Sequence, residues 1–315
     1  MDYLFLVIGI ALLVKGADFF VSGSSSVAKR LGVEEFIIGL TLVAFGTSAP
    51  ELAVSVTASL QGQNEIAISN VIGSNIFNIL TVLGISSIIL PLNVDKNILS
   101  KDLPFSIVAT LAVFIMCIDI PLGNGTTNAI SRGDGLLLLL FFCIFLFYTF
   151  SYAAKNKVVS NDNQTETLPL LTSVFLSILG LICVITGANI VIKHATNIAV
   201  AFNISQTIIG LTIVAIGTSL PELVTSIVAA KKGNSDIAIG NIVGSNIFNI
   251  VFILGTTATI DTVTVNSSNI MDIIIATIVS CILLVMAFTS RKIQRSEGIV
   301  LVFLLVLYYL FITFR

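Results

Sequence analysis

The sequence predicts an all-α membrane protein with ten transmembrane helices, arranged as two inverted-topology repeats of five helices each. Three observations carry this prediction: a very apolar composition, ten apolar stretches of membrane-spanning length, and a long internal repeat. Of the 315 residues, 56% are hydrophobic and only 10% are charged. A soluble domain would have about 25% charged residues. The net charge is −2 and no basic patch is visible, so nucleic acid is not an expected partner.

The ten predicted spans are separated by short polar connections. A helix needs about 20 apolar residues to cross the hydrocarbon core of a bilayer. The predicted spans are residues 2–22, 36–60, 66–90, 103–121, 135–153, 169–192, 207–230, 237–260, 270–289 and 297–314. The first of them lacks the basic start and the cleavage site of a signal peptide, so we interpret it as a membrane helix.

The longest polar connection divides the chain into two halves. We predict a first repeat over residues 1–154, a cytoplasmic linker over 155–168 and a second repeat over 169–315. Neither the linker nor any other connection is long enough to form a folded domain.

Basic residues divide unevenly between the two membrane faces that this count implies. One face carries Lys29, Arg30, Lys96, Lys101, Lys155, Lys157, Lys231, Lys232, Arg291, Lys292 and Arg295. The other face carries only Arg132, Lys193 and Arg315, and Lys15 lies within the first span. Because loops rich in Lys and Arg stay on the cytoplasmic side, we expect both termini to be extracellular.

The internal repeat relates two segments at a constant offset of 171 residues. Residues 39–84 align without a gap to residues 210–255, and 27 of the 46 aligned positions are identical. Two homologous halves with an odd number of helices must enter the membrane from opposite sides, which makes the repeat inverted. The identities concentrate on polar and helix-breaking residues rather than on apolar packing positions. This pattern favours a functional site over simple duplication of a bundle.

The motif GTSAPEL (46–52) and its counterpart GTSLPEL (217–223) predict a helix break within one span of each half. Glycine adopts backbone angles that other residues avoid, and the prolines remove a backbone donor and free carbonyls one turn earlier. Broken backbone at this depth must face protein or a water-filled cavity. A cation is the natural partner for the carbonyls near each break, for which the candidates are Ala44, Thr47, Ala215 and Thr218.

Glu51 and Glu222 follow the two breaks and would supply negative charge there. An ionised glutamate near the bilayer centre costs a few kcal/mol, so its presence in both repeats indicates a function.

The GSNIFN motif of the next span adds side chains to the same site. Ser74 and Asn78 are four residues apart and share a helix face, as do Ser245 and Asn249, whereas Asn75 and its counterpart Asn246 are expected to point elsewhere. Carboxylate, hydroxyl, amide and carbonyl oxygens together favour a hard cation such as Na⁺, Ca²⁺ or Mg²⁺. Polar residues can also simply join neighbouring helices, but that reading does not explain two glutamate-containing breaks at matching positions.

At these residues the sequence resembles the sodium/calcium exchanger family of the calcium/cation antiporter superfamily, whose repeats carry G-T-S-x-P-E and G-S-N-x-x-N. The resemblance covers essentially the whole chain and implies a sodium/calcium exchanger-like fold of ten helices. It implies alternating access, in which the first helix of each half slides, and a cluster of four cation sites. The ligands that it implies are Glu51, Glu222, Ser48, Ser219, Ser74, Ser245, Asn78 and Asn249 by side chain, and Ala44, Thr47, Ala215 and Thr218 by backbone carbonyl.

Some members of that family carry aspartate at the position of Asn249, which leaves only two carboxylates here. They would balance one Ca²⁺ or two Na⁺, and a third Na⁺ would leave the site at +1. The expected activity is secondary antiport of Ca²⁺ against Na⁺, with exchange of Ca²⁺ for H⁺ as the alternative and an ion channel as a more distant one.

A further set of expectations concerns what surrounds the transport function. We expect a multi-pass plasma-membrane transporter rather than an enzyme, because no nucleophile and base pair or histidine cluster is visible. We expect no cofactor besides the transported ions Ca²⁺ and Na⁺, with the lipid bilayer as surroundings. We expect a monomer without a protein partner.

Overall fold

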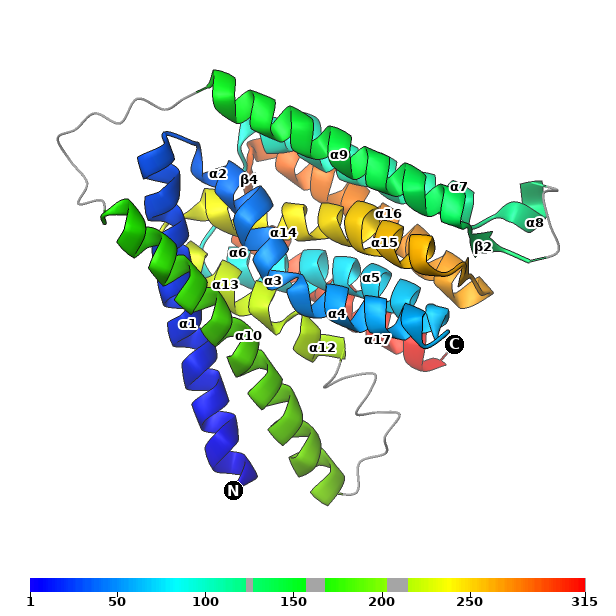
Figure 1. Cartoon of the computed structure of the whole chain (residues 1–315), viewed down its shortest axis with the longest axis horizontal. Helices are drawn as coiled ribbons and strands as arrows, with labels where there is room; N and C mark the ends of the chain where they lie inside the picture. The colour runs from blue at the N-terminus through cyan, green and yellow to red at the C-terminus, as the bar shows by residue number, and fades with distance from the viewer. Residues whose placement is uncertain (123–126, 157–167, 203–214, 315) are drawn as a thin grey trace.

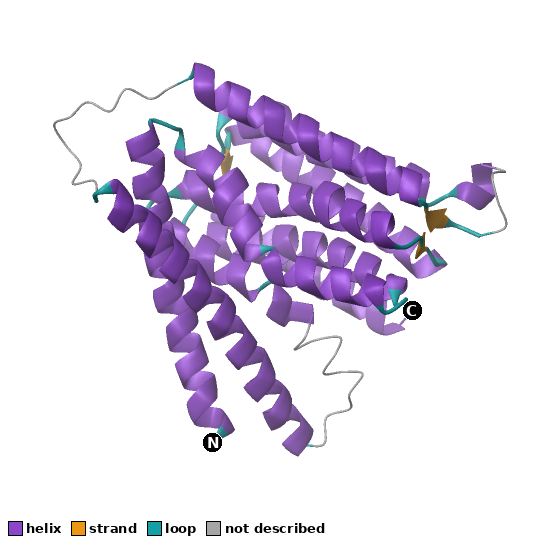
Figure 2. Cartoon of the chain, viewed as in Figure 1, coloured by secondary structure: helices purple, strands orange, loops and turns teal. Residues whose placement is uncertain are grey.

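The computed structural model describes residues 1–122, 127–156, 168–202 and 215–314. Figure 1 shows the helices arranged as one bundle, and Figure 2 shows that helix dominates while the few strands are very short. The helical elements are α1 (Asp2–Leu31), α2 (Glu35–Ile38), η1 (Gly39–Val43), α3 (Ala44–Thr47), α4 (Ala49–Leu60), α5 (Asn64–Phe77), η2 (Asn78–Leu83), α6 (Gly84–Ile89), η3 (Ile98–Asp102), α7 (Leu103–Met116), α8 (Asp119–Leu122), α9 (Arg132–Lys155), α10 (Leu170–Ala201), α12 (Ala215–Thr218), α13 (Leu220–Lys231), α14 (Ser235–Ile247), η5 (Phe248–Ile253), α15 (Leu254–Ile260), α16 (Ser267–Ser290) and α17 (Arg295–Phe314).

Within the described ranges, eight continuous helical segments are long and apolar enough to cross a membrane. The bent segment Glu35–Leu60 is a ninth. These segments correspond to nine of the ten predicted spans. The remaining predicted span, 207–230, begins on residues that lie outside the described part of the chain, and α12 and α13 are its described portion. Most of the predicted linker, 155–168, also lies outside the described residues.

The first and sixth spans are longer than predicted, because polar residues beyond the predicted ends find hydrogen-bond partners across the pair of helices that they form. α1 continues to Leu31 instead of residue 22, and α10 continues to Ala201 instead of residue 192. Ser24, Ser25 and Ser26 are all buried in α1. The Ser173 hydroxyl of α10 donates to Ser26 Oγ at 2.8 Å. A hydroxyl with such a partner costs little inside a helix interface, so these serines extend α1 instead of ending it.

Small residues let α1 and α10 pack very closely. A Cβ atom built on Gly180 would lie 2.4 Å from the backbone nitrogen of Phe20, and one on Gly16 would lie 2.7 Å from Cys183 Cβ. Close approach of backbones through glycine is typical of membrane helix pairs. In Figure 1 the two helices lie side by side and lean away from the rest of the bundle.

The centre of the bundle is formed by the two helices that follow the broken spans. Of the most apolar window of Ser235–Ile260, 94% of residues are buried, against 11% for Arg295–Phe314. The equivalent helix of the first half, Asn64–Ile89, is also largely buried. Central helices that face protein on all sides can carry polar residues that lipid-facing helices cannot.

Two short two-stranded sheets mark opposite ends of the bundle and display the inverted repeat. β1 (Leu92–Asn93) pairs antiparallel with β4 (Lys292–Ile293), and β2 (Ala129–Ile130) pairs antiparallel with β3 (Val263–Thr264). β1 and β3 are equivalent segments at the offset of 171 residues. The β1–β4 sheet is flanked by basic residues of the Lys-rich face, so equivalent segments of the two repeats lie on opposite membrane faces.

Candidate cation-binding site

The two helix breaks place one glutamate from each repeat in the interior of the protein. Ser48 separates α3 from α4 with a bend of 47° between Glu35–Thr47 and Ala49–Leu60, and Ser219 separates α12 from α13. The predicted break in the first half is therefore confirmed. Glu51 and Glu222 lie in the first turns of α4 and α13 and are 0% and 1% exposed. The helix dipole favours negative charge at this position.

Each glutamate receives a hydroxyl from the opposite repeat. Ser48 donates to Glu222 Oε1 at 3.0 Å, and Ser219 donates to Glu51 Oε1 at 3.2 Å. Ser74 of α5 also donates to Glu51 Oε1 at 3.2 Å, and its Oγ lies 2.7 Å from Ser219 Oγ. Each glutamate is thus bound by a serine of the other repeat, which places both glutamates and these serines in one cluster at the interface of the repeats.

Further residues of the predicted set border the Glu222 side of this cluster. Thr47 and Ser245 lie close enough to the Glu222 carboxylate to interact with it. The Thr47 hydroxyl is 3.0 Å from Asn241 Oδ1 and 3.3 Å from the Ala44 carbonyl. One hydroxyl proton can serve only one of these acceptors well, and the shorter contact is to Asn241.

The sequence suggested that the break frees the Ala44 carbonyl, but in the structure this carbonyl has a hydrogen-bond partner. It accepts the Ser48 amide at 3.0 Å, which leaves it one lone pair for a further partner. In the second repeat, Ala215 begins α12 and the buried Thr218 ends it, directly before the break.

The central helices bring Asn78 and Asn249 to the same interface. Both are buried; Asn78 is the first residue of the wide π-helical segment η2, and Asn249 is the second residue of the equivalent segment η5. Such turns are frequent at functional sites because they shift side chains away from regular helical positions. Asn75 and Asn246 form no hydrogen bond with a glutamate within the described part of the chain. They instead bond across the interface to Asn249 and Asn78.

Besides the Ser245 hydroxyl, four buried carboxylate and amide oxygens of this cluster have no hydrogen-bond partner among the described residues. They are Glu51 Oε2, Glu222 Oε2, Asn78 Oδ1 and Asn249 Oδ1. The four atoms form two symmetric pairs, one carboxylate and one amide oxygen from each repeat. A buried polar atom without a partner is rare and indicates a missing water molecule or ion.

The sequence interpretation missed two pairs of asparagine and serine that form hydrogen bonds next to the cluster. Asn70 donates to Ser55 Oγ at 2.9 Å and to the Glu51 carbonyl at 3.2 Å. Its repeat counterpart Asn241 donates to Ser226 Oγ at 3.0 Å. All four residues are identical between the repeats at the offset of 171, so the identities themselves were the signal that could have found them.

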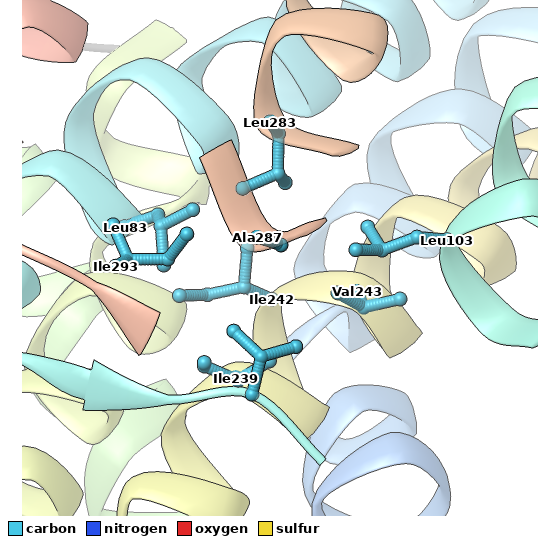
Figure 3. Close-up of a pocket in the computed structure, with 9 residues that line it drawn as sticks. Leu83, Leu103, Ile239, Ile242, Val243, Leu283, Ala287 and Ile293 are labelled. Carbon is cyan, nitrogen blue, oxygen red and sulfur yellow. The ribbon is translucent and has the colours of Figure 1, made fainter. Parts of the chain in front are cut away.

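A separate small cavity lies near the β1–β4 sheet and is lined by apolar side chains. Figure 3 shows its lining of apolar side chains, among them Leu83, Ile242 and Leu283, and no polar atom is drawn within it. A cation needs oxygen ligands, so this cavity is not a candidate for the ion site.

Comparison with known proteins identifies the family. The family described as "Sodium/calcium exchanger protein" matches residues 1–151 and 172–314. The chain belongs to the sodium/calcium exchanger family. Among curated relatives of this family is the sodium/calcium exchanger MaX1 of Methanosarcina acetivorans, which is 33% identical over 98% of this chain and 99% of its own. The inner membrane protein YrbG of Escherichia coli is 37% identical over 81% of this chain and 78% of its own.

A solved exchanger of the family has the same fold. The sodium-calcium exchanger NCX_Mj, soaked with zero Na⁺ and Ca²⁺, superposes with a TM-score of 0.85 at 35% identity. The match covers 100% of this chain and 99% of that one. The predicted fold class, a membrane protein of ten helices in two inverted repeats, is thereby confirmed.

Proposed function

We propose that this exchanger carries out secondary antiport of Ca²⁺ against Na⁺ at the cluster around Glu51 and Glu222. The observation that carries the proposal is the set of four unpartnered buried oxygens, two from carboxylates and two from amides. Hard oxygen donors of this kind suit Na⁺ and Ca²⁺. The curated relative MaX1, which is named a sodium/calcium exchanger, supports the same choice of ions.

The predicted ligands act in this proposal as one set that spans both repeats. Glu51 and Glu222 provide charge, and the hydroxyls of Ser48, Ser219, Ser74 and Ser245 line the site. Asn78 and Asn249 provide amide oxygens. The carbonyls of Ala44, Thr47, Ala215 and Thr218 complete the set.

Competition between the ions for the same oxygens supplies the coupling of transport. Two carboxylates neutralise one Ca²⁺ or two Na⁺, so either load makes the site neutral. An empty site would carry two negative charges through a low-dielectric interior, at a cost of several kcal/mol per ion. Only loaded forms then change the side to which the site is open, and leak is suppressed. We further propose a plasma-membrane location with both termini extracellular, as the distribution of basic residues favours.

Flux into liposomes tests the choice of counter-ion. Purified protein is reconstituted, and ⁴⁵Ca uptake is measured with an outward Na⁺ gradient and, separately, with an outward proton gradient at zero Na⁺. We expect uptake to follow the Na⁺ gradient. Uptake that ignores Na⁺ and follows the proton gradient would assign the protein to Ca²⁺/H⁺ exchange instead.

A further inference from the structure

Asn75 and Asn246 form a hydrogen-bonded arrangement that crosses the interface between the repeats. Asn78 Nδ2 donates to Asn246 Oδ1 at 3.1 Å, and Asn249 Nδ2 donates to Asn75 Oδ1 at 2.9 Å. Asn75 Nδ2 also donates to the Asn246 carbonyl at 3.1 Å. Asn75 and Asn246 are each 4% exposed, so water competes little for these bonds.

This arrangement fixes which way the amides of Asn78 and Asn249 face. A side-chain amide has a donor nitrogen and an acceptor oxygen, which a half-turn of its last bond exchanges. With the nitrogen held by an acceptor across the interface, the oxygen must face the other way. The structure leaves both of those oxygens, Asn78 Oδ1 and Asn249 Oδ1, buried and without a partner. The reverse orientation would bring two amide oxygens together and lose the bond.

We propose that Asn75 and Asn246 are positioning residues that turn the amide oxygens of Asn249 and Asn78 toward the transported cation. The proposal rests on the proposed function and names the residues that orient two of its unpartnered oxygens. Because each positioning residue belongs to the repeat opposite to the ligand it holds, the bonds also fix how the repeats meet around the ion.

The same bonds explain why amides suit positions 78 and 249 in this chain. An ionised carboxylate has no proton to donate, so an aspartate at either position could not form the cross-repeat bond. The arrangement therefore limits the fixed negative charge of the site to the two glutamates.

A double-mutant cycle separates positioning from simple helix packing. Equilibrium binding of ⁴⁵Ca is measured on the full-length protein in detergent without Na⁺, for the wild type, Asn246→Leu, Asn78→Ala and the double variant. Loss of one buried hydrogen bond corresponds to about a tenfold rise in the Ca²⁺ dissociation constant. If Asn246 acts through Asn78, the double variant binds no more weakly than Asn78→Ala alone, since the effects of coupled residues are not additive.

Two controls accompany the cycle. Asn246→Asp keeps an acceptor oxygen opposite Asn78 and should bind Ca²⁺ no more weakly than the wild type. Asn64→Leu removes another buried amide that bonds across the repeats, because Asn64 donates to Asp261 Oδ2 at 2.8 Å. Asn64 lies at the start of α5, far from Asn75, so this change should leave Ca²⁺ affinity unchanged. If Asn246→Leu does not give a cooperative thermal unfolding transition, Asn246→Ser, which is too short to reach Asn78, replaces it.

The outcomes separate this inference from the proposed function. If the wild type binds Ca²⁺ but Asn246→Leu has unchanged affinity, or the double variant shows additive effects, the positioning role is wrong and the proposed function stands. A wild type that binds no Ca²⁺ at millimolar concentration overturns the proposed function, and the positioning role falls with it. The reciprocal cycle with Asn75→Leu and Asn249→Ala must give the same result.

Discussion

At the scale of single residues, the pairing of two buried carboxylates without any basic partner dominates the chemistry. Glu51 and Glu222 accept hydroxyls from serines, and no Lys, Arg or His of the described chain forms an ion pair with either. Burial of an unpaired charge is costly. A cation between the two glutamates would remove that cost, so the bound ion should stabilise the folded protein.

Neutralising either glutamate should therefore abolish Ca²⁺ transport. Breaking a buried charge interaction costs about 3–5 kcal/mol, so Glu51→Gln and Glu222→Gln should each lower Na⁺-driven ⁴⁵Ca uptake by about 100-fold or more. Glu65→Gln is the matched control, because Glu65 is exposed at the start of α5 and should keep normal uptake. Near-normal uptake by either site variant would remove that glutamate from the site.

Calcium binding should also raise the thermal stability of the protein in a saturable way. A ligand that binds only the folded state stabilises it by about 2.7 kcal/mol at one hundred times its dissociation constant. The melting temperature should rise with Ca²⁺ in the wild type and stay constant in Glu51→Gln. An equal rise in both proteins would show that Ca²⁺ acts elsewhere.

The side chains of the site were predictable to the extent that they repeat. The acidic breaks and the Ser-x-x-x-Asn pairs stand out because the same polar residue occurs at equivalent positions of two otherwise apolar helices, one in each repeat. Their partners are not visible in the sequence, because hydrogen bonds such as Ser48 to Glu222 depend on how the two repeats meet. For the same reason the roles of Asn75 and Asn246 emerge only from the packed structure.

At the scale of elements, the proline after each break sits where a helix tolerates it. Pro50 occupies the first turn of α4, so its missing N–H leaves no donor unpaired and only interrupts the bond to the preceding turn. Local geometry at Ser48, with φ −81° and ψ 6°, then separates α3 from α4. The break directs the start of α4, and with it Glu51, into the interface.

Pro50→Ala should weaken transport without unfolding the protein. Alanine restores a backbone donor and favours a straighter helix, which would move Glu51 from its position. Misplacement of a functional group by about 1 Å costs up to 100-fold, so we expect uptake to fall by about tenfold to 100-fold. Pro104→Ala is the control, since Pro104 occupies the same place at the start of α7, away from the glutamates. Equal effects of both changes would show that the break has no special role.

The close packing of α1 and α10 should depend on Gly180. A valine there would collide with the backbone of Phe20, and overpacking costs about 1–3 kcal/mol. We expect Gly180→Val to lower the melting temperature measured by differential scanning fluorimetry. Gly133→Ala should leave it unchanged, because the nearest atom to a Cβ there is 3.6 Å away. A wild-type melting temperature for Gly180→Val would mean that the helices do not need this approach.

Apolar length predicted the number and order of the elements better than their ends. Helices that face lipid, such as α9 and α17, end close to the predicted limits because their apolar stretch ends there. α1 and α10 extend further because polar residues at their ends bond across the pair, as Ser173 does to Ser26 and Asn197 does to Asp2. This is a tertiary effect that hydropathy does not contain.

At the scale of the whole molecule, the inverted repeat brings equivalent segments to opposite faces. The turn between α4 and α5 and the turn between α13 and α14 are equivalent in sequence, with Gly62 and Gly233 both at positive φ. Asn64 joins the first turn to Asp261, beside the β2–β3 sheet. The basic pair Lys231 and Lys232 lies at the second turn.

Cysteine labelling tests this topology. In a background without the four native cysteines, a membrane-impermeant maleimide added to intact cells should label Gln63→Cys and not Lys231→Cys. Both positions are exposed, so lysis of the cells should make Lys231→Cys reactive as a positive control. Labelling of both positions in intact cells would contradict the inverted arrangement, and labelling of Lys231→Cys alone would reverse the proposed orientation.

A crystal of the full-length protein grown with Ca²⁺ and without Na⁺ tests most directly whether the two repeats form one cation site. Long-wavelength anomalous scattering should place a Ca²⁺ ion between the two glutamate carboxylates, with oxygen ligands about 2.3–2.6 Å away. Ca²⁺ found only elsewhere, or absent at a concentration that saturates binding in solution, would contradict the site.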